Sequence, residues 1–247
     1  MGQVPTGVTW ICRVCASRYP TWVAWCSTCQ SSYSMVVEPD RPIAHALGGV
    51  SIRSAKDVVA GAWSLVRAEP YDLPLGDPCF LLVYGEPGSG KSTFAYRLAG
   101  GLASRGRVGI LAAEEAPGPA MAHRLRHARL DRVGADILRG GGVDDLVDWA
   151  SSRHGRTLVI DSVTATYLGA PDCRHLLEVA GLSTVIAVAQ VLKDGRQAGP
   201  MALAHEADAI IHIAGGSWTV EKSRYGPAGV TGMVGLVGED SEVTHAV

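Results

Sequence analysis

The stretch CFLLVYGEPGSGKST, residues 79–93, decides the fold of this chain. Residues 79–84 are an apolar run, which predicts a buried β-strand. Residues 85–92 fit the pattern G-x-x-x-x-G-K-[S/T] at every fixed position. Residues 91–104 have helical character, so the loop opens onto a helix N-terminus, where backbone amides and the helix dipole favour an anion. This order of strand, glycine loop and helix predicts a phosphate-binding loop.

The residue types in this loop match the groups of a nucleoside triphosphate. Gly85 and Gly90 allow backbone amides to turn toward one anionic ligand. We expect Lys91 to reach the β- and γ-phosphates, and Ser92 to ligate Mg²⁺. The residues predicted to bind the nucleotide are consecutive: Gly85, Glu86, Pro87, Gly88, Ser89, Gly90, Lys91, Ser92 and Thr93.

Strand and helix patterns alternate along the rest of the chain. Apolar strands are predicted at 107–113, 156–162, 183–190 and 208–214, and helices at 116–130 and 143–153. Fully apolar strands that alternate with helices indicate an α/β fold, in which a mostly parallel twisted sheet has helices on both faces. Two hairpin-like strands, about 217–223 and 229–237, are predicted at the end of the chain.

Polar residues follow three of these strands, at the carboxyl ends of the strands, where ligand-binding and catalytic groups of parallel sheets are usually found. Asp161 ends an apolar strand and is expected to hold Mg²⁺ through water. Either Glu114 or Glu115 is expected to orient and deprotonate the water that attacks the γ-phosphate. Gln190 is expected to sense the γ-phosphate through its amide. The alternative for each acid is a simple cap on the following helix.

Four cysteines near the N-terminus have the spacing of a zinc site. They form two C-x-x-C pairs separated by ten residues, namely Cys12, Cys15, Cys26 and Cys29. Four thiolates complete a tetrahedral site without an open position, so we predict a structural Zn²⁺ that replaces the missing core of a short segment. Disulfides and a redox pair are the alternatives, and both fit this pattern less well. The predicted organisation is a C4 zinc-finger module at 1–35, a linker at 36–60 and the core at 61–247.

Composition and charge exclude several classes of protein. The 247 residues carry a net charge of −2, so charge alone does not point to nucleic acid as a partner. No apolar run approaches the roughly 20 residues of a membrane span, and the N-terminus lacks the features of a signal peptide. We therefore expect a cytoplasmic protein with no membrane partner. The basic helix at 123–132 is predicted to be a solvated face, and His123 and His127 are not predicted to bind metal.

Taken together, the motifs resemble those of the bacterial RadA/Sms ATPases. The zinc knuckles, the phosphate loop, AAEEA, LVIDSVT, VLKDGRQAGPMALAHEAD and EKSRYGPAG occur in the order of that family. The resemblance covers nearly all of the chain and implies a RecA-like core of the DnaB type, with ATP as the nucleotide. It favours Glu114 as the catalytic glutamate, with Glu115 in reserve. Full-length members of the family continue into a Lon-protease-like domain, which we expect this chain to lack.

The resemblance also implies a role for the cations near the end of the chain. KSRYG resembles the family's K-N-R-F-G, so Lys222 and Arg224 are expected to reach the nucleotide of a neighbouring subunit, with Arg224 as an arginine finger. Two residues apart on a strand, they are expected to project from one face. The implied protein is a translocase or helicase-like motor on single-stranded DNA in recombination or repair. It would act as a homo-oligomer, expected to be a hexameric ring, with Lys193 and Arg196 facing the DNA.

A different class of function stays open. In it, ATP binding only switches assembly, and the zinc module recruits a protein partner such as a replication or recombination protein. A small-molecule kinase is a third and weaker interpretation, because it leaves Lys222, Arg224 and the zinc module without a role. Stimulation of ATP hydrolysis by single-stranded DNA distinguishes the motor from the other two.

Overall fold

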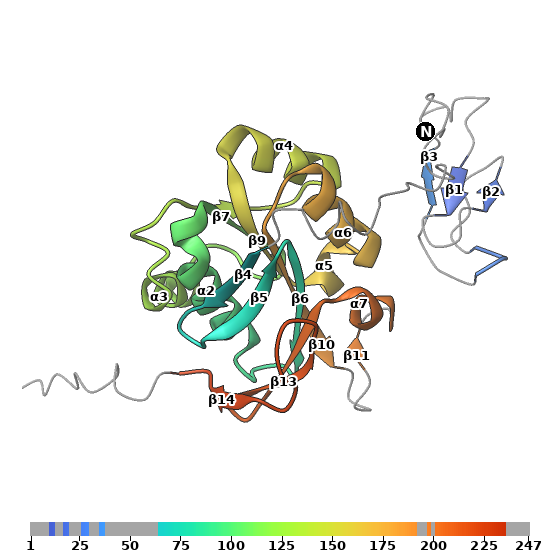
Figure 1. Cartoon of the computed structure of the whole chain (residues 1–247). Helices are drawn as coiled ribbons and strands as arrows, with labels where there is room; N and C mark the ends of the chain where they lie inside the picture. The colour runs from blue at the N-terminus through green and yellow to red at the C-terminus, as the bar shows by residue number, and fades with distance from the viewer. Residues whose placement is uncertain are drawn as a thin grey trace, which may run out of the picture. The chain divides into compact units, whose positions relative to one another are not determined.

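In the computed structural model of the protein, the described residues are 10–12, 17–19, 26–29, 35–37, 64–191, 197–198 and 201–235. They belong to two compact units, Met1–Gly61 and Ala62–Val247, each a body of its own (Figure 1). The finer division of the first unit into a zinc module and a linker stays a prediction. No helix in the described part of the chain is long and apolar enough to cross a membrane.

The first unit contains a small antiparallel sheet. Its central strand is β1 (Trp10–Cys12), which pairs with β2 (Arg18–Tyr19) on one side and β3 (Met35–Val37) on the other. Strands of two and three residues bury little apolar surface, so this sheet needs support from another source.

The second unit is built on one large sheet, whose order is β14-β13-β12-β6-β10-β9-β7-β8, with β11 paired to β10. The strands from β12 to β8 in this order are parallel to their neighbours, whereas β13, β14 and β11 are antiparallel. The bounds are β6 (Cys79–Gly85), β7 (Arg107–Ala112), β8 (Ala135–Leu138), β9 (Gly155–Asp161), β10 (Thr184–Val191), β11 (Gln197–Ala198), β12 (Ala209–Ala214), β13 (Ser217–Ser223) and β14 (Thr231–Met233).

Helices cover both faces of this sheet, and a separate hairpin of β4 (Ser64–Ala68) and β5 (Leu73–Asp77) joins them. The helices are α2 (Lys91–Leu102), α3 (Pro119–His127), α4 (Val143–Arg153), α5 (Val163–Thr166), α6 (Ala170–Val179) and α7 (Met201–Glu206), with a 3-10 turn at Ala103–Arg105. The α/β fold predicted from the alternation is therefore confirmed.

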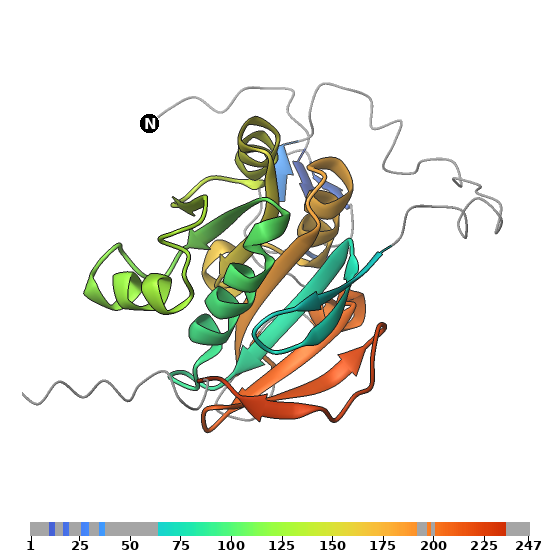
Figure 2. The ribbon, with the colours of Figure 1, turned by 60° about the vertical axis from the view of Figure 1, so that its left-hand side comes forward.

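Alternating side chains of the buried strands divide the core into two layers. On β6, Leu81 and Val83 face the cluster that contains α2, α3 and the β4–β5 hairpin. Phe80 and Leu82 face the opposite cluster, which contains α4, α5, α6 and α7. This is the two-residue period of a strand buried on both faces. Figure 2 shows α2 and the β4–β5 hairpin on the same side of the sheet.

Several elements differ from their predicted bounds. The helix predicted at 116–130 is shorter, because α3 begins only at Pro119, the first helical residue after Gly118. The last predicted strand, 229–237, is the three-residue β14, and residues beyond 235 lie outside the described part. Helix α6, strand β8 and the β4–β5 hairpin were not predicted.

Candidate active site

The phosphate loop connects the end of β6 to the first turn of α2, as its motif predicts. Gly88 and Gly90 have φ angles of 76° and 103°, a left-handed backbone that glycine adopts without strain. A Cβ on Gly85 would lie 2.2 Å from the carbonyl oxygen of Ile213 and 2.9 Å from the Ser89 Oγ. Glycine at this position therefore lets β6 and β12 lie close together where the loop begins.

Two polar groups of this loop suit an anionic ligand. Lys91 is 8% exposed as a residue, and its ammonium donates a 2.6 Å hydrogen bond to the carbonyl of Glu86 within the loop. Burial lowers the pKa of Lys91, and the nearby carboxylates of Asp161 and Glu114 oppose that shift. The Ser89 Oγ is buried and has no hydrogen-bond partner within the described residues. A buried cation beside an unsatisfied hydroxyl is what a phosphate group would satisfy.

The other predicted loop residues surround this pair. Glu86, Pro87 and Gly88 are exposed at the tip of the loop. Ser92 and Thr93 are half-buried in the first turn of α2. The loop therefore has the strand-to-helix context that the motif requires, and the donor set fits a triphosphate.

Asp161 ends β9 and lies against this first turn. The hydroxyls of Ser92 and Tyr96 donate hydrogen bonds to its carboxylate. Burial raises the pKa of Asp161, and these two hydrogen bonds and the charge of Arg124 oppose the rise. A serine hydroxyl beside a half-buried carboxylate is a pair of oxygen ligands of the kind that Mg²⁺ takes in nucleotide sites. The sequence analysis does not single out Tyr96. Its position, one turn after Ser92 on the same helix, is the signal that places its hydroxyl on the same face.

Glu114 follows β7 and turns toward the same edge of the sheet. The amide of Ala113 donates a 2.9 Å hydrogen bond to the carbonyl of Asp161, which ties the two strand ends together. Ser162 Oγ donates a hydrogen bond to Glu114 Oε1. Gln190 Nε2 lies 3.2 Å from Oε1 and 3.0 Å from Oε2 of the same carboxylate. The two residues therefore hold the carboxylate in a fixed orientation.

Strand order explains why these groups meet. Strand β10 lies between β6 and β9, and in its register Gln190 is level with Gly85 while Val188 is level with Asp161. Parallel strands bring their carboxyl ends to one edge. The phosphate loop, Gln190, Asp161 and Glu114 therefore share that edge, as predicted.

The side chain of Glu115, the residue after Glu114, contacts a different part of the structure. Its carboxylate pairs with Arg124 of α3, and that guanidinium also lies 5.7 Å from the centre of the Tyr96 ring. Arg124 is only 21% exposed. The prediction that the basic helix 123–132 is a solvated face is therefore wrong for Arg124, because α3 packs this side chain against α2 and the loop after β7. The His123 and His127 rings lie next to each other on α3, with centres 4.2 Å apart and planes tilted by 55°.

The side chains of Lys222 and Arg224 lie near the amino-terminal ends of β6 and β12, whereas the phosphate loop follows the carboxyl end of β6. Ser223 is level with Ala209, and Ala209 is level with Leu81 near the start of β6, far from Gly85 at its end. From Phe80 to Gly85 the strand spans about 16 Å at roughly 3.3 Å per residue. Lys222 is level with Leu82, midway along β6, but its ammonium binds the carbonyls of α7. Arg224 binds Asp208, so neither side chain points to the phosphate loop of its own chain. Lys193 and Arg196 fall at 192–196, outside the described residues.

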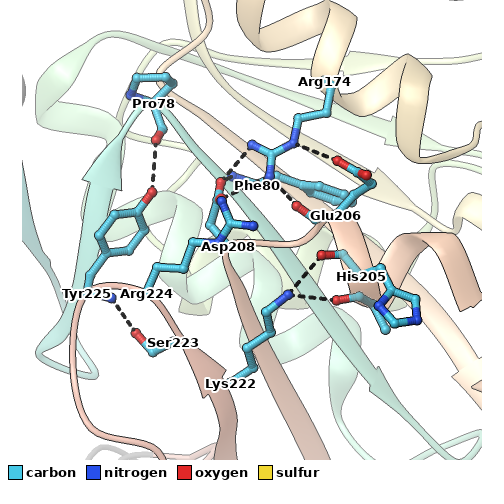
Figure 3. A network of polar contacts seen from close by, with 11 residues as sticks. Pro78, Phe80, Arg174, His205, Glu206, Asp208, Lys222, Ser223, Arg224 and Tyr225 are labelled. Carbon is cyan, nitrogen blue, oxygen red and sulfur yellow. Dashed lines mark hydrogen bonds and ion pairs between the residues drawn. The ribbon is translucent and has the colours of Figure 1, made fainter. Parts of the chain in front are cut away.

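The two cations also differ in direction, as Figure 3 shows. Lys222 Nζ donates to the carbonyls of Ala204 and His205 at 3.0 and 2.9 Å. Arg224 lies just beyond the end of β13 and pairs with Asp208. The two side chains lie in one neighbourhood, but each has its own partner.

A thiol cluster lies in the small unit. The Sγ atoms of Cys12, Cys26 and Cys29 all lie within 4.8 Å of one another, and the Cys12 and Cys29 sulfurs are 3.5 Å apart. The Tyr19 hydroxyl lies 3.2 Å from the Cys26 sulfur. Cys15, the fourth predicted ligand, lies outside the described residues. Three converging thiols suit a soft, tetrahedral cation such as Zn²⁺.

Several curated proteins with similar sequences are named DNA repair protein RadA. The DNA repair protein RadA of Pseudomonas aeruginosa is 25% identical over 260 residues, which cover 91% of this chain and 57% of the relative. RadA of Brucella abortus is 24% identical, with 92% and 57% covered, and RadA of Chlamydia pneumoniae is 24% identical, with 90% and 55% covered. The expected resemblance to RadA is confirmed, and the chain spans about half the length of the curated relatives it matches.

No protein-family model matches the chain. Among solved structures, a chain described as an ATPase domain is similar with a TM-score of 0.47 and 16% identity. That likeness covers 62% of this chain and 80% of the other.

Proposed function

We propose that this RadA-like chain is an ATPase of DNA repair or recombination that moves along single-stranded DNA as a ring-shaped homo-oligomer. The main support for this proposal is that two groups of residues expected to act on one nucleotide lie at opposite ends of the strands in a single chain. The phosphate loop and its acids lie at one edge of the sheet, whereas Lys222 and Arg224 lie at the other. Each subunit then completes the site of a neighbour rather than its own, which makes hydrolysis a property of the assembly.

Within one subunit, the loop residues would hold the triphosphate. The amides of the loop and the Lys91 ammonium would bind its phosphate oxygens in place of the Glu86 carbonyl that Lys91 now contacts. Ser92 and Asp161 would hold Mg²⁺, which would neutralise charge on the β- and γ-phosphates.

Glu114 is the group that would deprotonate the attacking water. Its carboxylate lies at the edge shared with Lys91 and Asp161, and the amide of Gln190 orients it. Because Gln190 bonds to Glu114 and ends the strand beside β6, it is also suited to respond to the γ-phosphate. We favour Glu114 over Glu115 for this role because the Glu115 carboxylate pairs with Arg124.

The neighbouring subunit would supply the remaining positive charge. Arg224 is 55% exposed at the far edge of the sheet, where another chain can approach it. An arginine finger stabilises the charge of the transition state and is worth about 10³–10⁵ in rate. Arg224→Ala should therefore lower hydrolysis about 10³-fold or more in an assembled sample, without lowering nucleotide affinity. Full activity of this variant in a verified oligomer would refute the shared site.

Single-stranded DNA is the proposed track, and the name of the relatives, DNA repair protein RadA, supports DNA as the ligand. With a net charge of −2, affinity would depend on a local set of cations, for which Lys193 and Arg196 are the candidates. We therefore expect DNA to stimulate hydrolysis at low salt and to lose this effect as salt rises. If DNA neither stimulated ATP hydrolysis nor bound to the protein at low salt, the motor hypothesis would be refuted, and an ATPase with another function would remain.

The thiol cluster supports a second candidate function. Cys12, Cys26 and Cys29 belong to a unit separate from the core, so a Zn²⁺-bound module there could recruit a replication or recombination protein. In that case ATP would switch assembly only. Two results would favour this adaptor. ATP hydrolysis would be slow and unchanged by DNA, and the intact chain would capture such a partner whereas the Cys26→Ser variant would not.

A further inference from the structure

The carboxylate of Asp208 lies where several elements meet at the edge of the sheet that carries Arg224. Asp208 directly precedes β12 and its side chain is 4% exposed. Its backbone is fixed on two sides, because its amide donates to the carbonyl of Phe80 at 2.8 Å and its carbonyl accepts from the amide of Arg224 at 3.0 Å. The side chain therefore has little freedom to move.

This carboxylate has used all of its acceptor capacity. Oδ2 accepts from the Phe80 amide at 2.8 Å and from Arg174 Nη1 at 2.9 Å. Oδ1 accepts from Arg174 Nη2 at 2.9 Å and pairs with Arg224 Nη1 at 3.1 Å. A carboxylate offers about four lone-pair sites, and these four contacts fill them. Figure 3 shows the two guanidinium groups converging on Asp208 from different elements.

The two arginines are held to different degrees. Arg174 is 26% exposed, binds Asp208 with two nitrogens, approaches Glu206 with its Nε at 3.6 Å, and lies over the Phe80 ring. Arg224 is 55% exposed, and Asp208 is the one polar partner of its side chain in the described part of the chain. Arg174 is therefore a structural clamp, whereas Arg224 is held by one nitrogen and keeps its other donors for another molecule.

The turn that carries Arg224 is anchored on either side. Lys222 Nζ caps the carbonyls of Ala204 and His205 at the end of α7. Ser223 Oγ accepts hydrogen bonds from the amides of Tyr225 and Gly226 at 3.1 and 3.0 Å. The backbone around Arg224 is thus fixed, and Asp208 fixes the side chain.

We propose that Asp208 is the positioning residue for Arg224, holding the guanidinium so that it meets the nucleotide of the neighbouring subunit. The proposal rests on the shared site proposed above and adds the group that sets its geometry. Asp208 touches neither the nucleotide nor the reacting atoms and acts only through Arg224. Displacing a positioned group by about 1 Å can cost roughly 10²-fold in rate.

A pair of single variants tests this role. Asp208→Asn is nearly isosteric and keeps an acceptor for the Phe80 amide, but it removes the charge that holds Arg224. We expect kcat per assembled site to fall by about 10–10²-fold, with the nucleotide dissociation constant unchanged. Arg174→Met is the matched control, because it breaks the same buried cluster and leaves the Asp208–Arg224 pair in place. Both variants should unfold at lower temperature, but Arg174→Met should keep kcat within about twofold.

A double-mutant cycle distinguishes positioning from plain stabilisation. If Asp208 acts only through Arg224, Asp208→Asn should change kcat little in an Arg224→Ala background, whereas independent effects would multiply. Equal loss in Asp208→Asn and Arg174→Met, or multiplying effects in the cycle, would overturn the proposal. If Asp208→Asn does not fold, Asp208→Glu replaces it, since it keeps the charge and moves it by one methylene. Full activity of Arg224→Ala alone would instead refute the shared site on which the proposal rests.

Discussion

Replacing Glu114 by glutamine removes the proposed base and keeps the size of the side chain. An amide can still accept a hydrogen bond from Ser162 or Gln190, so the local structure should hold. General-base catalysis contributes about 10²–10⁴-fold, which corresponds to roughly 3–6 kcal/mol of barrier at about 1.4 kcal/mol per decade. We expect hydrolysis to fall by that factor while nucleotide affinity stays within about threefold.

The adjacent residue provides a matched control. Glu115→Gln removes an equal charge one position along, but it breaks only the partly exposed pair with Arg124. Pairs of this kind are worth on the order of 1 kcal/mol of stability or less. We expect hydrolysis to stay within about threefold of wild type and the unfolding midpoint to fall slightly.

Both variants would be measured by steady-state release of phosphate at saturating ATP, with a fluorescent nucleotide to report affinity. Assembly would be checked by light scattering in the same buffer. If Glu115→Gln abolished hydrolysis while Glu114→Gln left it within tenfold of wild type, the assignment of the base would be refuted, and the Arg124 pair would have to open on nucleotide binding.

Three further changes follow from individual contacts. Gly85→Ala places a Cβ 2.2 Å from the carbonyl of Ile213, so we expect a loss of about 1–3 kcal/mol in the free energy of unfolding, read from urea titration. Tyr96→Phe removes one hydroxyl donor from Asp161, so the Mg²⁺ concentration for half-maximal hydrolysis should rise several-fold while kcat at saturating Mg²⁺ stays near wild type. Cys26→Ser should abolish bound zinc, measured by emission spectrometry against about one per chain in the wild type, and leave the unfolding of the core unchanged.

The elements that sequence analysis predicted are those with local signals. The phosphate loop and the strands after it are specified by glycine positions and apolar runs within a few residues, so their bounds were close to β6 and β10. Helix α6 also has such a signal, because Cys173, Leu176 and Leu177 have helical spacing and are all buried. Strand β8 has only four half-buried residues and therefore no pattern to detect.

The roles of neighbouring acids and cations depended on tertiary contacts. The residues alone leave Glu114 and Glu115 equivalent, and the family resemblance favours Glu114. The physical difference between them comes from the packing of α3, which brings Arg124 to Glu115. The resemblance to RadA singled out Lys222 and Arg224, but it contained nothing about Asp208. Asp208, two residues after α7, pairs with Arg224 just beyond β13, and its carboxylate also binds Arg174 of α6, 34 residues earlier in the chain.

The two proposed halves of the site are connected through β6. This strand begins beside Asp208, whose carboxylate binds the Phe80 amide, and ends at Gly85 in the phosphate loop. It is paired with β10 on one side and β12 on the other, and its residues are almost entirely buried. Changing the distance between its ends would require breaking ladder hydrogen bonds on both sides, each worth about 1 kcal/mol. If hydrolysis occurs between subunits, the motion that accompanies it must therefore arise at the interface between chains, while the core of each chain moves as a rigid body.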